Sequence, residues 1–424
     1  MQPSIESALS IISSHKPIAQ KSAEWLAARK NLIAASEAGY LLGIKSTSSM
    51  LNYMKTKCNI TSSLDYLSTL DSIRHGCIYE DVSRAIYESR NGIHVREYGL
   101  ITTSKNPILG ASPDGIVLST NPDARYQDIS RIGRIVEIKN PYDYDPSDII
   151  KPEYIIQVLQ QQYVLGLPSC DFIKTNIIGS TVNEKTKNKG INPYYNIDAF
   201  LEDILPNSAS ISYPEGLELL NKNIPQCNLS SRGMEKGILI YYKDAKTGQY
   251  ITHLYPLETP YTKPAILEWI KTTKARIASE HGINQSHIAV EYWYLAAYFE
   301  KTLEYDSYLF ESIYLPRLEL VWRLITCIRQ MQEQENHSID TISNFIDYIL
   351  KPHLNKPSAF YKSIANQKEI CNILETAAQL DISPSFNDAN LGKATATTTT
   401  KATATTTTIA KNKAKAKVIV EYDF

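Results

Sequence analysis

The segment Arg134–Lys139, with the sequence RIVEIK, most constrains what this chain can fold into. Its three β-branched residues are typical of a buried strand. Because strand side chains alternate between the two faces of a sheet, Glu137 and Lys139 share one face while Ile138 packs behind them. A carboxylate and an ammonium group directed into one buried space are costly unless the protein uses them there. The segment therefore predicts a central strand with a chemically active face.

A Ser-Pro-Asp-Gly turn precedes this strand, at Ser112–Gly115, between the apolar runs Ile108–Leu109 and Ile116–Leu118. A turn of this kind can join two antiparallel strands, and we expect it to bring Asp114 beside Glu137. Two carboxylates and a backbone carbonyl form the oxygen-only ligand set that Mg²⁺ or Mn²⁺ prefers. Taken alone, the Glu-Ile-Lys motif would be explained as a surface ion pair, and the Ser-Pro-Asp-Gly motif as an ordinary turn. Their order along the chain favours a metal site, next to which a lysine can stabilise charge on a phosphate oxygen.

Two further helices are expected to add side chains to this site. The apolar spacing of residues 74–88 predicts a helix that carries Glu80, and residues 153–166 predict one that places Gln157 and Gln161 on one face. A glutamate on a helix is ordinarily solvated. The place of its helix before the turn adds to the case for Glu80, whose role at the site is implied by the family resemblance described below.

The region 21–43 predicts helical structure, with a second helix that begins at Ser36. As an N-cap, Ser36 would direct backbone N–H groups toward an anion. Arg29 lies on the first helix, and a guanidinium beside a helix N-terminus suits a phosphate group. The alternative is an amphipathic helix with a solvated arginine.

Four motifs together resemble a known family. They are W-x-x-x-R-x-x-x-I-A-A-S from Trp25 to Ser36, S-P-D-G, E-I-K, and Y-I-I-Q-V at Tyr154–Val158. The chain resembles the PD-(D/E)XK nucleases, specifically the lambda-exonuclease or YqaJ-type viral recombinases, over residues 21–180 and more loosely to about residue 330. The resemblance implies an α/β, restriction-endonuclease-like core, with a mixed central sheet flanked by helices and an extra helical C-terminal part.

The same resemblance implies a role for each motif residue. The expected ligands of Mg²⁺ or Mn²⁺ are Asp114, Glu137, the carbonyl oxygen of Ile138 and Glu80. Lys139 and Gln157 are expected to complete the catalytic set by orienting a water molecule. The residues expected to hold the 5′-terminal phosphate of DNA are Arg29, Ser36 and Ser112.

The function implied is that of a Mg²⁺-dependent exodeoxyribonuclease, working 5′→3′ on the ends of duplex DNA in viral recombination or repair. Two alternatives stay open: a PD-(D/E)XK endonuclease or junction resolvase, and a non-catalytic DNA-binding assembly protein. A single-strand annealing protein is a candidate partner, a homo-oligomer is left open, and no membrane partner is expected.

Composition limits the site and its setting. The formal net charge of the 424 residues is −1, so the positive potential that DNA requires must be local. Six scattered cysteines without a C-x-x-C pair indicate reduced, intracellular thiols, and argue against a zinc or iron–sulfur site. The chain has no apolar run of membrane-spanning length, and Glu6 interrupts the first apolar stretch, so neither a transmembrane helix nor a signal peptide is expected. An infected host cell is the expected location.

The predicted organisation has four parts. Residues 1–20 are an N-terminal extension, and 21–335 form the nuclease domain, with core motifs in 21–180 and an insertion at 185–235. Residues 336–386 are a helical extension. Residues 387–424 are a low-complexity tail in which KATATTTT occurs twice, predicted to be disordered. The tail ends in VIVEYDF, which suits either a docking peptide or an unconstrained end.

Secondary structure is also expected outside the motifs. Residues 45–70 are rich in Ser, Thr, Asn and Lys, which predicts a mobile segment. A hairpin is expected over 237–242 and 250–255, followed by a helix at 263–281.

Overall fold

The structure, a computed structural model, describes residues 4–14, 18, 20, 22–44, 47–60, 71–180, 192–203, 235–245, 247–256, 259, 261–334 and 343. Residues 1–322 form one compact unit and residues 323–424 a second. The predicted extension 336–386 and the predicted tail 387–424 lie outside the described residues, apart from residue 343. Among the described residues, no helix is long and apolar enough to cross a membrane.

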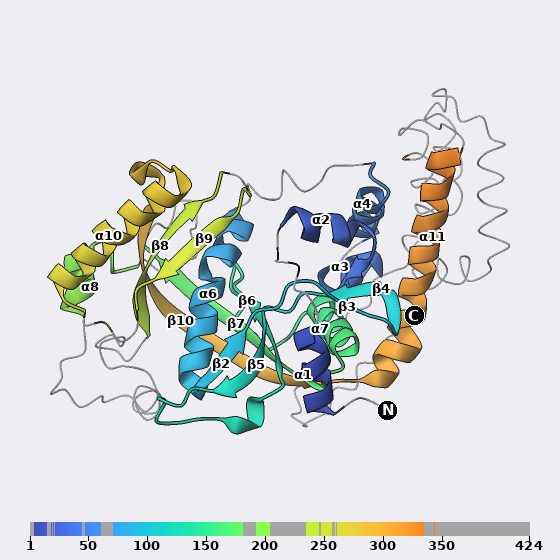
Figure 1. The fold of residues 1–424 in the computed structure, drawn as a ribbon, viewed down its shortest axis with the longest axis horizontal. Coiled ribbons are helices and arrows are strands. Elements are labelled where there is room, and N and C mark those ends of the chain that lie inside the picture. Colours follow the sequence, from blue (N-terminus) through green and yellow to red (C-terminus); the bar gives the residue numbers. More distant parts are fainter. Residues whose placement is uncertain are drawn as a thin grey trace, which may run out of the picture. The chain divides into compact units, whose positions relative to one another are not determined.

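A seven-stranded mixed sheet forms the centre of the first unit (Figure 1). Its strands, in spatial order, are β2 (Ile93–Arg96), β5 (Gly115–Thr120), β6 (Ile135–Lys139), β7 (Ser169–Gly179), β10 (Ala289–Glu304), β8 (Lys236–Lys243) and β9 (Tyr250–Leu254). Only the β6–β7 pair is parallel, and the other neighbours run antiparallel. The expected mixed central sheet is therefore confirmed, and the β8–β9 pair is the expected hairpin.

A second, three-stranded sheet lies beside helix α7 (Pro152–Leu165). It consists of β1 (Ile33–Ala34), β4 (Asn106–Ala111) and β3 (Ile101–Thr103), with β4 in the middle. β1 runs parallel to β4, and β3 runs antiparallel to it. This small sheet fixes the N-terminal motif against the turn that precedes β5.

Helices make up much of the remaining described residues. They are α1 (Ile5–Ser14), α2 (Ala23–Lys30), α3 (Ala35–Leu41), α4 (Thr47–Lys57), α6 (Asp71–Asn91), α7 (Pro152–Leu165), α8 (Ile197–Glu202), α10 (Lys263–His281) and α11 (Leu315–Gln334). The helix expected at 263–281 is confirmed, while the helix expected over 74–88 extends further at both ends. The short connections include 3-10 turns at Ile129–Arg131 and Gln285–His287 and a π-helix at Tyr308–Tyr314.

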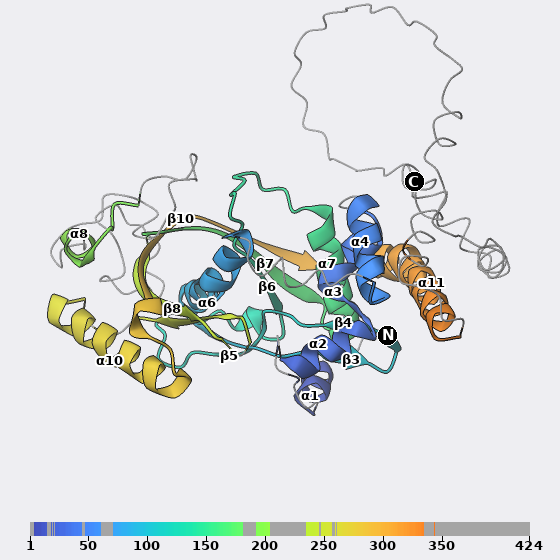
Figure 2. The ribbon, with the colours of Figure 1, turned by 90° about the horizontal axis from the view of Figure 1, so that it is seen from above.

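The two faces of β6 meet different helices. Val136 and Ile138 pack with Tyr87 of α6 in one apolar cluster. Glu137 pairs in register with Phe172, whose ring lies 5.9 Å from that of Tyr154 on α7. Because alternate residues point to opposite faces, α6 covers one side of β6 and α7 the other (Figure 2). Glu137 therefore points toward α7, as the strand pattern predicted.

The Pro-Asp-Gly turn does not make a hairpin, contrary to our expectation. β4 and β5, on its two sides, belong to different sheets, so the chain leaves one sheet at Ala111 and enters the other at Gly115. A Cβ atom at Gly115 would collide with the side chain of Val95 on β2. The glycine is needed because the strands lie so close together at this crossing.

Two other local predictions are wrong. The N-cap of α3 is Ala34, and Ser36 lies inside the first turn. The cause is the parallel pairing of Ile33 and Ala34 with β4, which keeps these residues extended up to the helix. Much of the segment 45–70, expected to be mobile, forms α4, whereas residues 61–70 lie outside the described residues.

Candidate active site

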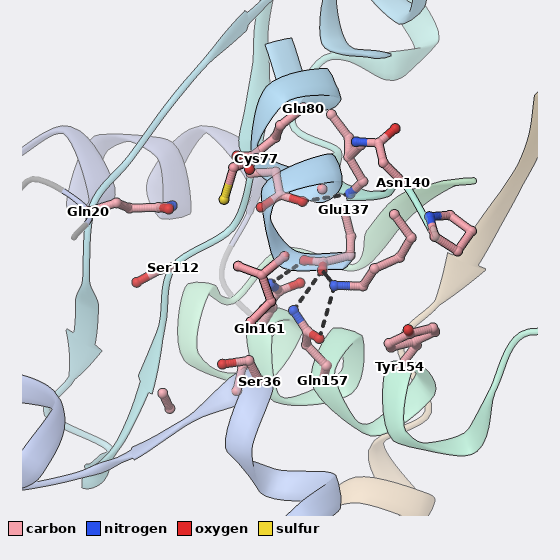
Figure 3. A pocket seen from close by; sticks show the side chains of 18 of the residues that line it. Gln20, Ser36, Cys77, Glu80, Ser112, Glu137, Asn140, Tyr154, Gln157 and Gln161 are labelled. Atoms are coloured by element: carbon pink, nitrogen blue, oxygen red, sulfur yellow. Dashed lines mark hydrogen bonds and ion pairs between the residues drawn. The ribbon is translucent and has the colours of Figure 1, made fainter. Parts of the chain in front are cut away.

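A cleft at the end of β6 collects the predicted site residues. It encloses about 580 Å³ and lies between the first turns of α6, helix α7 and the start of α3 (Figure 3). All nine predicted residues line it: Arg29, Ser36, Glu80, Ser112, Asp114, Glu137, Ile138, Lys139 and Gln157. Their roles stay predictions, but the sequence motifs do meet at one place.

Glu137 lies at the centre of this cleft and is 1% exposed. Its Oε1 accepts hydrogen bonds from Nζ of Lys139 and, at 2.6 Å, from Nε2 of Gln157. Its Oε2 accepts one from Nε2 of Gln161 at 2.7 Å. Lys139 Nζ also donates to Oε1 of Gln157 at 3.3 Å. Both carboxylate oxygens are thus fixed by donors from β6 and α7.

Asp114 is held by the backbone of β6. Its Oδ2 accepts a hydrogen bond of 2.6 Å from the N–H of Ile138. The backbone pairing of β5 with β6 ends at Gly115 and Val136. Beyond that pair, the N–H of Ile138 has no partner on β5, and the Asp114 carboxylate accepts its hydrogen bond instead. The hydrogen bond to the backbone of β6 therefore holds the Asp114 carboxylate at the site, next to the end of the β5–β6 pairing.

The electrostatics around Asp114 are unbalanced. Burial raises the pKa of its carboxyl well above the usual value, and the charges of Glu137 and Glu80 raise it further. Lys139 and the Ile138 N–H act in the opposite direction without cancelling the effect. The negative charges of Glu137 and Glu80 therefore repel that of Asp114, and the ammonium group of Lys139 offsets only part of this repulsion.

Lys139 keeps its charge in this setting. Burial alone would lower the pKa of its ammonium, but Glu137 and Asp114 raise it above the usual value. The Nζ atom also lies 4.9 Å from the ring centre of Tyr154, where a cation is attracted by the aromatic face. Lys139 is therefore a fixed cation beside both carboxylates.

These residues suit a divalent cation. The donors are hard oxygen atoms, from Asp114, Glu137, Glu80 and the Ile138 carbonyl, and the repulsion that raises the pKa of Asp114 would be relieved by a positive ion. Within the described ranges, no three His, Cys, Asp or Glu side chains form a ready cage. Mg²⁺ does not need one, because one or two carboxylates, with water and phosphate oxygens, are its usual ligands.

The opposite side of the cleft is cationic. The guanidinium of Arg29 stacks 4.2 Å from the ring centre of Trp25, and its Nη2 donates to the hydroxyl of Ser36 at 3.1 Å. Nε1 of Trp25 donates to the hydroxyl of Ser112 at 3.1 Å. Trp25 thus links residues that come from distant motifs and were predicted to form one phosphate site. Its ring contacts Arg29, which bonds Ser36, and its N–H bonds Ser112.

Helix α7 connects the two sides. Gln160 donates from Nε2 to the carbonyl oxygens of Ile33 and Gly110, at 2.8 and 3.1 Å, and so ties α7 to the small sheet. A Cβ atom on Gly39 would lie 2.8 Å from Cβ of Glu153, so α3 approaches α7 closely where it carries a glycine. The same helix therefore fixes the carboxylate of Glu137 and packs against the start of the segment that carries Ser36.

Sequence reasoning missed three polar residues of this site. Gln161 was placed on the correct helix face but given no role, although its spacing of four residues from Gln157 was the available signal. Glu37 and Lys57, both buried, contact Arg29. Nothing in the sequence around Lys57 indicates that its ammonium group is buried.

The fold and cleft define an α/β domain with a buried acidic centre next to a cationic corner. Residues 24–168, which contain every predicted site residue, match the profile of the YqaJ-like viral recombinase domain. Over these residues the chain is similar to that family.

Several proteins resemble the chain. An uncharacterized protein of Acanthamoeba polyphaga mimivirus is 25% identical over 381 residues, a stretch that covers 85% of this chain and 58% of that protein. The chain thus spans a little over half the length of this relative. Among solved structures, the alkaline exonuclease LHK-Exo from Laribacter hongkongensis is 29% identical, with a TM-score of 0.29, over 37% of this chain and 74% of the other. A complex of LHK-Exo with dAMP gives 28% identity and the same TM-score and coverage.

Proposed function

We propose that this chain is a metal-dependent deoxyribonuclease that degrades duplex DNA from its ends in the 5′→3′ direction. The observation that carries the proposal is the meeting of two kinds of site in one cleft. Asp114, Glu137 and Lys139 form a centre suited to phosphodiester hydrolysis, and Arg29 lies in the same cleft where it can hold a phosphate.

Each residue has a defined task in this proposal. Asp114, Glu137, the Ile138 carbonyl and Glu80 would hold Mg²⁺ or Mn²⁺, which supplies Lewis acidity at the scissile phosphate. Lys139 places its ammonium charge next to the carboxylates, where it can stabilise negative charge that develops on a phosphate oxygen.

The two glutamines hold the geometry. Gln157 and Gln161 donate to opposite oxygens of Glu137, which fixes the plane of its carboxylate. The Oε1 of Gln157 also accepts from Lys139, which keeps the ammonium beside Glu137. A small rotation of either group would misplace it relative to the phosphorus atom.

The cationic corner sets polarity in this proposal. A 5′-terminal phosphate bound by Arg29, Ser36 and Ser112 would fix the strand end relative to the carboxylates, so that cleavage releases nucleotides from that end. Because residues 24–168 match the profile of a viral recombinase domain and a relative occurs in a giant virus, we place this activity in viral DNA recombination within an infected cell.

The test compares linear and circular duplex DNA of one sequence in Mg²⁺. We expect digestion of linear DNA only, faster with 5′-phosphate than with 5′-hydroxyl ends, and no digestion by Glu137→Gln. Cleavage of closed circles at the linear rate would favour an endonuclease. Equal activity of wild type and Glu137→Gln would refute the assignment of this cleft.

A further inference from the structure

Behind Arg29 lies a buried group of three charges. Oε1 of Glu37 accepts from Nη2 of Arg29 at 3.0 Å, and Oε2 lies 2.7 Å from Nζ of Lys57. The side chains of Arg29, Glu37 and Lys57 are 19%, 11% and 5% exposed. Oε2 also accepts from the N–H of Ala34 at 3.0 Å. Glu37 therefore links the end of α2, the start of α3 and the end of α4.

Lys57 is tied to the backbone of the Arg29 segment. Its Nζ donates to the carbonyl oxygens of Arg29 at 2.5 Å and Leu32 at 2.7 Å. These carbonyls lie at the C-terminal end of α2, where the helix dipole favours a positive charge. A buried lysine with these partners is a fixed part of the structure.

The charge balance gives Lys57 its importance. Arg29 and Glu37 alone would be a neutral pair, and an anion approaching Arg29 would be repelled by the Glu37 carboxylate behind it. With Lys57 the group carries a net charge of +1. Burial would raise the pKa of Glu37, but Arg29 and Lys57 outweigh it and lower that pKa, so the carboxylate stays ionised.

Arg29 also keeps donors for a ligand. Within the described part of the chain, its side-chain hydrogen bonds to Ser36 and Glu37 both use Nη2. A guanidinium has five N–H donors in a planar fork, so Nε and Nη1 are left for a phosphate. The guanidinium lines the cleft in which that phosphate would lie.

We propose that Lys57 makes the corner selective for a terminal phosphate, because it neutralises Glu37 and so leaves the charge of Arg29 for the DNA end. Glu37 orients the guanidinium, and Lys57 cancels the electrostatic cost of that carboxylate. Both are positioning residues that act through Arg29. The proposal rests on the proposed function and adds the residues that determine its preference for a DNA end.

The test changes the charge of the group in steps. Lys57→Met gives a net charge of 0, Glu37→Gln gives +2, and Glu37→Gln/Lys57→Met restores +1. Lys57→Gln also removes the charge but keeps a donor for the Arg29 and Leu32 carbonyls. Lys271→Met on α10, whose side chain is 79% exposed, is the control for loss of one surface charge.

Binding is measured without divalent metal, by fluorescence anisotropy of a short oligonucleotide with a 5′-phosphate or a 5′-hydroxyl. We expect the preference for phosphate to fall at least about tenfold in both Lys57 variants, as for loss of a charge-assisted contact. It should stay in Glu37→Gln and Lys271→Met, and return in the double variant. In Mg²⁺, KM for phosphorylated ends should rise while kcat changes little.

Other results would overturn the proposal. If the Lys57 variants keep the wild-type preference, the charge of Lys57 does not serve Arg29. If the double variant is as poor as Lys57→Met, or does not fold while Lys57→Gln folds and keeps its preference, Lys57 has only a structural role. A wild type that prefers phosphate but digests no DNA would instead reject the nuclease assignment and leave this inference standing.

Discussion

Two buried carboxylates on neighbouring strands have opposite surroundings. Glu137 on β6 is 1% exposed and Asp171 on β7 is 0% exposed. Asp171 accepts hydrogen bonds from Arg131 at 2.7 Å and Arg134 at 3.0 Å. Glu137 accepts a hydrogen bond from one lysine, and its charge acts together with that of Glu80 on Asp114. Asp171 thus contacts two cations, of which Arg131 also pairs with Asp128 and Glu300. Glu137 belongs to a group of three acids with one lysine.

The sheet register keeps these groups apart. Asp171 pairs with Val136 and Phe172 with Glu137, so Asp171 points toward α6 and Glu137 toward α7. The pKa of Asp171 lies below its usual value, whereas that of Asp114, next to Glu137, lies well above. A buried carboxylate whose pKa is lowered by neighbouring arginines is part of a structural ion-pair network, whereas one whose pKa is raised in a cleft is a candidate for a site that binds a cation or substrate.

The largest expected effect is a loss of nuclease activity on changing Glu137, which a change of Asp171 should not cause. Glu137→Ala removes a proposed metal ligand and the partner of Lys139, so we expect digestion of linear DNA to fall on the order of 1,000-fold or more. Its melting temperature should fall less than that of Asp171→Asn, because the loss of the partner of Lys139 is offset by the removal of repulsion with Asp114. A variant that melts much earlier would mean that Glu137 is structural, like Asp171.

Asp171→Asn should act mainly on stability. The change leaves Arg134 without its buried counter-charge and removes one of the three carboxylates that pair with Arg131. We expect the free energy of unfolding to drop by about 3 kcal/mol. Denaturant titration measures the loss. At a temperature where the variant stays folded, its rate on linear DNA should match wild type, and a selective loss of activity would contradict the comparison.

Gln161→Leu should have a smaller effect on rate. It removes the hydrogen-bond donor to Oε2 of Glu137. Loss of a residue that orients a metal ligand by a hydrogen bond typically costs about tenfold or somewhat more in metal affinity or activity. Gln162→Leu is the matched control, because Gln162 on the same helix donates to the carbonyls of Pro168 and Leu303. Equal losses of activity in both would argue against a role for Gln161 at the site.

The smallest effect is a difference in acid sensitivity. Burial would raise the pKa of Asp171, but hydrogen bonds from Tyr87 and Thr302 and the two arginines lower it. Its stabilisation is present above the unfolded-state pKa of about 3.9 and is lost as pH falls through the lower folded-state value. Between about pH 5 and pH 2, wild type should lose stability more steeply than Asp171→Asn.

Elements that depend on local pattern could be predicted from the sequence. The strand β6 and the helices α7 and α10 have clear periodicity and end at proline, glycine or a change of polarity. The meeting of Asp114 and Glu137 in one cleft was also predicted, from motif order and the resemblance.

Features that depend on tertiary pairing could not be predicted. An apolar run on each side of Asp114 indicates two strands, but it does not indicate which other strands they pair with. In the structure, β4 and β5 belong to different sheets. The early start of α3 depends on the pairing of Ile33 with Leu109. Lys57 was missed because a lysine in a polar segment is normally solvated, and only the fold buries it against Glu37.

The most direct test of the account is Mn²⁺ binding, measured by isothermal titration calorimetry at neutral pH without DNA. Wild type and Asp171→Asn should bind the ion with the same affinity, and Asp114→Asn and Glu137→Gln should show at least about tenfold weaker binding. Unchanged binding in both cleft variants would contradict the claim that the unbalanced carboxylates form the metal site.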